Sequence, residues 1–154
     1  MIIRKGTPED LKELQHLYIN SIREICKNDY SPKQIEVWVS GIKNLKRWNA
    51  MLTDQYVLVA QSENTITGFC TLDKGNYIDF FYVHKEFQRR GIAQTLYNAI
   101  EKVAREKYQS EITSDVSKTA RPFFEKMGFS VLKEQVIIRD DVLLTNFKMI
   151  KNLN

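Results

Sequence analysis

Cysteine, histidine and proline are scarce in this 154-residue chain, which contains two, two and three of them. The spacing of Cys26 and Cys70 matches no zinc or redox motif, so we expect both thiols to be reduced. His16 and His84 are isolated in the sequence and suggest no metal site. A chain of this length can bury enough apolar surface to fold without a disulfide or a metal.

Long apolar runs are also missing. No segment approaches the length of a membrane span. Residues 1–5 lack the apolar run of a signal peptide. These absences predict a cytoplasmic protein that does not associate with a membrane.

Neither sign of charge dominates, because 23 Lys and Arg stand against 19 Asp and Glu, a formal net charge of +4. A mildly basic chain favours anionic ligands. A polynucleotide binder usually shows a longer basic stripe with interleaved aromatics, so we expect no nucleic-acid partner. A basic RNA- or DNA-binding protein remains a third hypothesis, and it predicts strongly salt-dependent binding to polynucleotide. The basic residues gather in two short clusters: Lys43, Lys46 and Arg47, and Lys85, Arg89 and Arg90.

The hydrophobic pattern alternates between strand and helix along the chain. It predicts strands at residues 1–5, 56–60, 65–72, 77–84, 111–116, 129–139 and 142–150. It predicts helices that begin after Thr7, after Ser31-Pro32, after Gly91 and at Ser117. Residues 42–54 are ambiguous and indicate at most a short helical turn. The resulting order is β-α-α-β-β-β-α-β-α-β-β, with no linker, and we expect one domain over residues 1–154.

The most informative segment is the loop Gln88-Arg89-Arg90-Gly91-Ile92-Ala93, which joins a strand to a helix. The first amides of a helix have no partner within it and lie at the positive end of its dipole. They can therefore bind a pyrophosphate, with charge added by the two arginines. Gly91 would let the backbone approach phosphate oxygens where a Cβ would collide. The alternative is a charged turn that ends in glycine and binds no ligand.

This loop resembles the Gln/Arg-x-x-Gly-x-Gly/Ala signature of the GNAT superfamily of N-acetyltransferases. The aromatic–Val pair Tyr82-Val83 precedes it, and the pair Gly128-Phe129 follows the second helix, as in that family. The resemblance is most specific from Asp79 to Phe129. It is closest to a bacterial subgroup with an Ala-Arg-Pro-Phe-Phe-Glu segment, here Ala120 to Glu125. It implies an α+β fold with a central mixed sheet of roughly six or seven strands and about four flanking helices.

The resemblance also implies acetyl-CoA as co-substrate and no metal. The backbone of Phe81 and Val83 would pair with the pantetheine arm like an added strand, in a slot where two strands diverge. Ser117 stands near the position of a family asparagine and could bond the cofactor. The implied cofactor-binding residues are Phe81, Val83, Gln88, Arg89, Arg90, Gly91, Ile92, Ala93 and Ser117.

Acetyl transfer to an amine needs a group that removes a proton, because such amines are mostly charged at neutral pH. Asp79 is the candidate base, since it matches an acidic position that often precedes the aromatic–Val pair. The alternative is an acid that caps a strand or pairs with a lysine. The general acid is unassigned, because Phe124 stands at the usual tyrosine position. Water, Tyr82 or Ser117 could supply that proton.

The acceptor pocket of such enzymes is usually built by the first two helices and the late strands. There the sequence supplies Tyr30 and Trp38, with Asp29 and Trp48 nearby, and aromatic and acidic residues together suit an organic cation. Helical spacing favours a core position for Trp38. Asp115 either holds a cationic acceptor or caps the helix after it, and we favour the cap.

The leading hypothesis is therefore an N-acetyltransferase that moves an acetyl group from acetyl-CoA to a primary amine of a small molecule or peptide. The amine would attack directly in a ternary complex. The alternative is a non-catalytic acyl-CoA sensor with the same fold, which Phe124 favours. Exposed strands at the end of the sheet could also form a homodimer.

Overall fold

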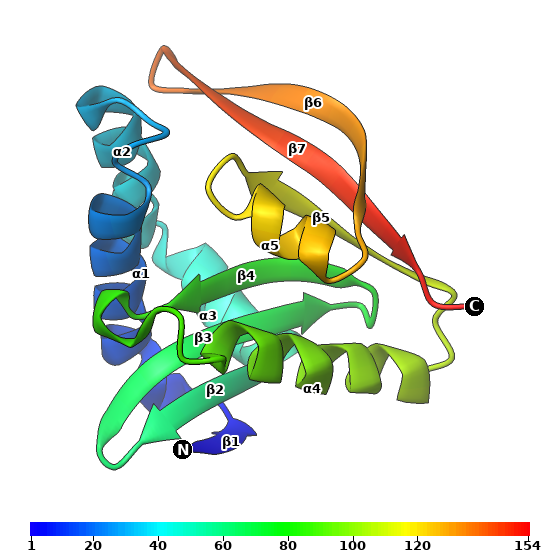
Figure 1. The fold of residues 1–154 in the computed structure, drawn as a ribbon. Helices are drawn as coiled ribbons and strands as arrows, with labels where there is room; N and C mark the ends of the chain where they lie inside the picture. The colour runs from blue at the N-terminus through cyan, green and yellow to red at the C-terminus, as the bar shows by residue number, and fades with distance from the viewer.

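Seven strands form one sheet in the computed structural model, which describes residues 1–154 (Figure 1). The strands follow the order β1-β2-β3-β4-β5-β7-β6 across the sheet. Only β4 and β5 pair in parallel, and every other neighbouring pair is antiparallel. The predicted α+β fold with a mixed sheet is confirmed. The strands are β1 Ile2–Lys5, β2 Tyr56–Ser62, β3 Thr65–Asp73, β4 Tyr77–Val83, β5 Glu111–Ser117, β6 Ser130–Arg139 and β7 Val142–Asn152.

Five α-helices cover the sheet, and their bounds are α1 Leu11–Ile25, α2 Pro32–Val39, α3 Leu45–Asp54, α4 Ile92–Glu106 and α5 Arg121–Lys126. Figure 1 shows α4 and α5 on one face and α1 and α3 on the other. No helix is both long enough and apolar enough to cross a membrane.

Two helices differ from the sequence prediction. Residues 45–54 form a full helix, α3, because the Asn44 side chain caps it by accepting from the Arg47 amide at 3.1 Å. The side chains of Trp48 and Met51 then become buried. The other helix, α5, begins at Arg121 rather than at Ser117, which is the last residue of β5.

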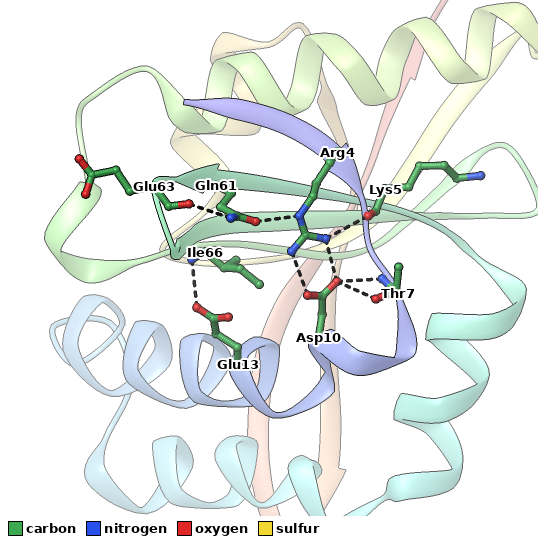
Figure 2. A network of polar contacts seen from close by, with 8 residues as sticks. All are labelled: Arg4, Lys5, Thr7, Asp10, Glu13, Gln61, Glu63 and Ile66. Carbon is green, nitrogen blue, oxygen red and sulfur yellow. Dashed lines mark hydrogen bonds and ion pairs between the residues drawn. The ribbon is translucent and has the colours of Figure 1, made fainter.

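The first strand is tied to the first helix by a polar network (Figure 2). The Arg4 guanidinium donates two bonds of 2.9 Å to Asp10 and a third, of 2.7 Å, to Gln61 on β2. Asp10 also accepts from the Thr7 amide at 2.8 Å, so the chain turns into a helical conformation directly after Thr7, as predicted. Glu13, in the first turn of α1, accepts from the Ile66 amide of β3 at 3.1 Å. These contacts hold the N-terminal end of α1 against the sheet.

The sheet separates two apolar cores. The α4–α5 face buries Leu96 and Phe124, and the α1–α3 face buries Leu14 and Trp48. Gly68 of β3 lets α4 lie close, because a Cβ there would be 3.0 Å from Leu96 Cδ1 and 3.1 Å from a backbone carbonyl oxygen.

A bulge in β4 sets the face on which its side chains lie. Asp79 and Phe80 together oppose the single residue Thr71 of β3. The Phe80 amide donates to the Thr71 hydroxyl at 3.1 Å. Since side chains alternate along a strand, the extra residue shifts the alternation. Ile78 and Phe81 therefore share the α4–α5 face, while Phe80 packs on the α1–α3 face.

Candidate functional site

The parallel strands β4 and β5 pair at only two positions and then separate. Tyr77 pairs with Thr113 and Ile78 with Ser114, where the Ser114 hydroxyl donates to the Ile78 carbonyl at 2.8 Å. Beyond Ile78 the edge of β4 has no pairing with β5. The expected divergence of the two strands is therefore present, and it begins at the bulge.

A cavity of about 390 Å³ lies at this separation. Its wall is built by α1, α2, α3, β4, β5, the first residues of α4 and α5, and the hairpin of β6 and β7. Of its 29 lining residues, 18 are hydrophobic, so the wall suits an organic molecule with an apolar body. The predicted site residues that line it are Tyr30, Trp38, Asp79, Phe81, Val83, Gln88, Ala93, Asp115, Ser117 and Phe124.

The loop before α4 lies beside this cavity and has the backbone that its glycine predicts. Gly91 is the N-cap of α4 with φ +76°, a left-handed conformation that L side chains rarely adopt. No atom lies within 4 Å of the place where its Cβ would be, so the backbone there is open to a ligand. Arg89 and Arg90 are exposed, and the Arg90 guanidinium lies 5.0 Å from the Phe87 ring centre. Such an exposed helix N-terminus with added positive charge can bind an anion.

Not every loop residue reaches the cavity. Arg89, Arg90 and Gly91 lie outside its wall, and Ile92 is buried in the core beneath α4. The Gln88 side chain turns back on the chain, where its Nε2 donates to the Val83 carbonyl at 2.9 Å.

The edge of β4 offers backbone groups to the gap. The His84 amide donates to Thr67 on β3 at 2.7 Å. Because backbone groups of successive residues point to opposite edges of a strand, those of Val83 and Phe81 face away from β3. The Val83 carbonyl is occupied by bonds from Gln88 and from the buried Ser21 hydroxyl, at 3.2 Å. An extended ligand would therefore find the Val83 amide and the backbone of Phe81 along this edge.

Asp79 is held by its neighbours on the α1–α3 side of β4. Arg47 donates two bonds to its carboxylate, of 3.0 and 2.9 Å, and Gln55 donates a third of 2.7 Å. The Arg47 guanidinium also lies 4.6 Å from the Phe80 ring centre. A carboxylate accepts about four hydrogen bonds, so three of the Asp79 acceptor positions are in use.

Asp115 differs from Asp79 because no cation pairs with it. Its carboxylate accepts from the Tyr77 hydroxyl at 2.7 Å and from Gln135 of β6 at 2.9 Å. Burial and the hydrogen bond to Asp115 both raise the pKa of Tyr77 well above its ordinary value, so the phenol stays protonated. Asp115 caps no helix, which corrects the role favoured from the sequence. The Ala120 amide, near the start of α5, instead bonds the Ser117 hydroxyl at 3.1 Å.

The aromatic residues divide between cavity wall and core. Trp38 is half-buried, because it packs against the core of the α1–α3 face and also lines the cavity, whereas Trp48 is fully buried. The Tyr30 ring lines the cavity and packs edge-on against Trp38, with centres 5.3 Å apart. The Tyr30 hydroxyl donates to Thr145 of β7 at 2.6 Å and accepts from the Lys118 amide at 2.9 Å. Tyr30 thus joins the segment before α2 to β5 and β7, which no local sequence pattern indicated.

Phe124 is packed among other aromatic rings and has no hydroxyl. Its ring lies 5.8 Å from that of Phe81 and 5.1 Å from that of Phe129. Tyr82 packs on the opposite face, with its ring centre 4.9 Å from that of Tyr18. Burial raises the pKa of Tyr82 well above its ordinary value. Ser117 keeps its own O–H proton available, because its oxygen acts as the acceptor in the bond from the Ala120 amide.

Arg47, Tyr77 and Arg139 are among the wall residues that were not predicted as site residues. Arg47 belongs to a basic cluster visible in the sequence, but its partner lies 32 positions away. Nothing local distinguishes Arg139 from the other charged residues of the last hairpin.

Comparison with known proteins agrees with this geometry. The family model described as an acetyltransferase (GNAT) domain matches residues 26–151. YafP, an uncharacterized N-acetyltransferase of Escherichia coli K12, is 34% identical over 147 residues, which are 96% of this chain and 93% of YafP.

Two solved structures are similar over nearly the whole chain. A GCN5-related N-acetyltransferase from Rhodopseudomonas palustris has a TM-score of 0.94 and 30% identity, covering 99% of this chain and 95% of its own. The PaiA N-acetyltransferase from Thermoplasma acidophilum, in complex with coenzyme A, has a TM-score of 0.80 and 25% identity, with 98% of each chain covered.

Proposed function

Because the chain belongs to the GNAT family of acetyltransferases, we propose that it transfers the acetyl group of acetyl-CoA to a primary amine of a small molecule or peptide. The amine attacks the thioester directly in a ternary complex. The single observation that carries the proposal is the separation of β4 from β5, which connects the α4 N-terminus to a largely apolar cavity.

In this proposal, acetyl-CoA extends from the N-terminus of α4 to the edge of β4. The amides at the start of α4 and the charges of Arg89 and Arg90 hold the pyrophosphate. The pantetheine arm lies along the β4 edge at Phe81 and Val83, beside Ala93 and Ser117. Coenzyme A is present in the similar Thermoplasma structure, which supports an acyl-CoA for this chain as well.

Two carboxylates flank the point where the strands separate, and each is a candidate to take a proton from the ammonium group. Asp79 is the base predicted from the sequence. Asp115 is favoured by the contacts, because it has no cationic partner and accepts bonds only from Tyr77 and Gln135. We propose that Asp115 binds the ammonium group of the acceptor and takes its proton, whereas Asp79 holds Arg47 in place.

The reaction forms an N–C bond and breaks the C–S bond of the thioester. The attacking ammonium loses one proton before attack and a second as the amide forms. One proton ends on the departing thiolate, and the other goes to solvent. Since Phe124 has no proton to donate, the Ser117 hydroxyl bonds the departing sulfur and water supplies the proton. Holding both substrates in one cavity gives most of the rate gain.

A second candidate function is an acyl-CoA sensor without turnover, favoured by the buried Phe124 at the usual tyrosine position. The Ala120–Glu125 segment remains a proposed marker of the bacterial subgroup. A homodimer through the β6 edge is also a proposal, supported by the exposed apolar side chains of Val136 and Ile138.

Initial rates of thiol release, with acetyl-CoA and a panel of primary amines varied together, test the function. Intersecting double-reciprocal lines are expected for direct attack in a ternary complex, and parallel lines would contradict it. Binding of acetyl-CoA without release of thiol by any amine would support the sensor.

A further inference from the structure

Two guanidinium groups from different elements line the cavity. Arg47 comes from α3 and Arg139 from the end of β6, and both line the wall. Arg47 is paired with Asp79. Arg139 takes part in none of the eight ion pairs of the chain, although Asp140 and Asp141 follow it in the hairpin turn.

Tyr18 lines the same cavity as the two arginines. Burial raises the pKa of Tyr18 to about 12, and the charges of Arg47 and Arg139 both oppose that rise. The hydroxyl itself donates to the Trp38 carbonyl at 3.2 Å. Since Asp79 pairs with Arg47, the Arg139 guanidinium is left without an ionic partner in the cavity.

The carboxylate without an ionic partner, Asp115, lies nearer the start of β6 than Arg139 does. Asp115 is bonded to Gln135, which precedes Arg139 by four residues on β6. Residues four apart on a strand point to the same face and are separated by roughly 13 Å. The cavity thus has an acidic end at Asp115 and a basic end at Arg139, and the apolar side chain of Ile137, which also lines the wall, lies between them on β6.

We propose that the acceptor is an amine that also carries a carboxylate or phosphate group several bonds away, and that Arg139 holds this anionic group beside Arg47. This inference rests on the proposed acetyl transfer for the identity of the amine end. A guanidinium suits the role because its planar set of donors matches the oxygens of both anions. The sequence alone had suggested an organic cation, and the basic end of the cavity adds an anionic group to that acceptor.

The test compares three probes of similar length: 5-aminopentanoate, the neutral 5-aminopentanamide, and 4-aminobutyl phosphate. For the native protein with acetyl-CoA, kcat/KM is expected to be about tenfold or more higher for an anionic probe than for the amide. The carboxylate and phosphate arms show which anion is preferred. Arg139→Gln should remove the preference by raising KM, with kcat nearly unchanged, and Arg139→Lys should restore part of it. Lys133→Gln, which removes an exposed charge of the same strand outside the cavity, should leave the preference intact.

Equal use of the amide by the native protein, or an unchanged preference in Arg139→Gln, would overturn the inference. Ligand-observed NMR of 5-aminopentanoate binding provides a readout without turnover. Weaker binding to Arg139→Gln than to Lys133→Gln, by about tenfold, is expected even if no amine is acetylated. If the native protein shows this difference in binding but acetylates no amine, the result contradicts the proposed function and not the anion site. If 5-aminopentanoate binds equally to Arg139→Gln and Lys133→Gln, the result contradicts the anion site.

Discussion

Arg47 binds both carboxylate oxygens of Asp79, at 3.0 and 2.9 Å, at the position where β4 bulges and leaves β5. The pair connects α3 to the central strand, and Gln55 completes it from the end of that helix. Asp79 therefore fixes the wall of the cavity, and Asp115 on the neighbouring strand stays available to a ligand. In the proposed mechanism, Asp79 therefore has a structural role and Asp115 a functional one.

Replacing Asp79 by Asn should lower stability, because it removes a charged partner from Arg47 at a site where Asp79 is only 11% exposed. The expected loss is about 1–2 kcal/mol in the free energy of unfolding. Denaturant unfolding of Asp79→Asn, Arg47→Gln and the double variant measures the coupling between the two residues. Additive losses would show that the pair contributes nothing.

Replacing Asp115 by Asn should lower activity rather than stability, because its carboxylate is exposed and has no ion pair. General-base contributions suggest a fall in kcat of about a hundredfold. Glu63→Gln removes an exposed carboxylate from a distant turn and serves as the control. If Asp115→Asn keeps full activity while Asp79→Asn is folded but inactive, the general base is Asp79 and not Asp115.

Replacing Gly91 by Ala should weaken acetyl-CoA binding beyond what backbone strain explains. A left-handed residue costs about 1–2 kcal/mol when it gains a Cβ. Gly75→Ala is the matched control, because Gly75 has a similar φ of +81° in a turn far from the α4 N-terminus. Both variants should lose stability in thermal unfolding, and only Gly91→Ala should bind acetyl-CoA less well. Equal binding of acetyl-CoA by the two variants would show that Gly91 does not contact this ligand.

Glu101 of α4 should give a pH-dependent contribution to stability. Although burial opposes ionisation, bonds from Lys151, Tyr97 and Arg105 lower its pKa to about 2, from 4.5 in the absence of these contacts. A lowered folded-state pKa stabilises the fold above pH 4.5, and this stabilisation is lost as pH falls toward 2. Glu101→Gln should therefore be less stable at pH 7 by about 1–3 kcal/mol. The difference from the native protein should shrink between pH 4.5 and 2, and a constant difference would contradict this account.

Local signals predicted most of the fold and the part of the site that depends on local backbone. Thr7 and Gly91 stand at helix starts as expected, because helix starts and left-handed turns have residue preferences that are visible in a short segment. The helix over residues 45–54 was missed because its cap, Asn44, follows a 3-10 turn rather than a loop.

The contacts that give the site its chemistry could not be predicted in this way. Arg47 and Asp79 are 32 residues apart, and Tyr77 and Asp115 are 38 apart, so their pairing depends on the sheet order and on the β4 bulge. The position of Arg139 depends on where the last hairpin lies, which one sequence without its fold does not indicate.

Calorimetric titration with acetyl-CoA tests the central claim most directly, comparing the native protein with an Arg90→Glu plus Gly91→Trp variant. The account predicts saturable one-to-one binding to the native protein and no measurable binding to the variant, with circular dichroism showing that both are folded. Failure of the folded native protein to bind acetyl-CoA would contradict both the acetyltransferase and the sensor. Equal binding by the variant would place the co-substrate elsewhere than on the α4 N-terminus.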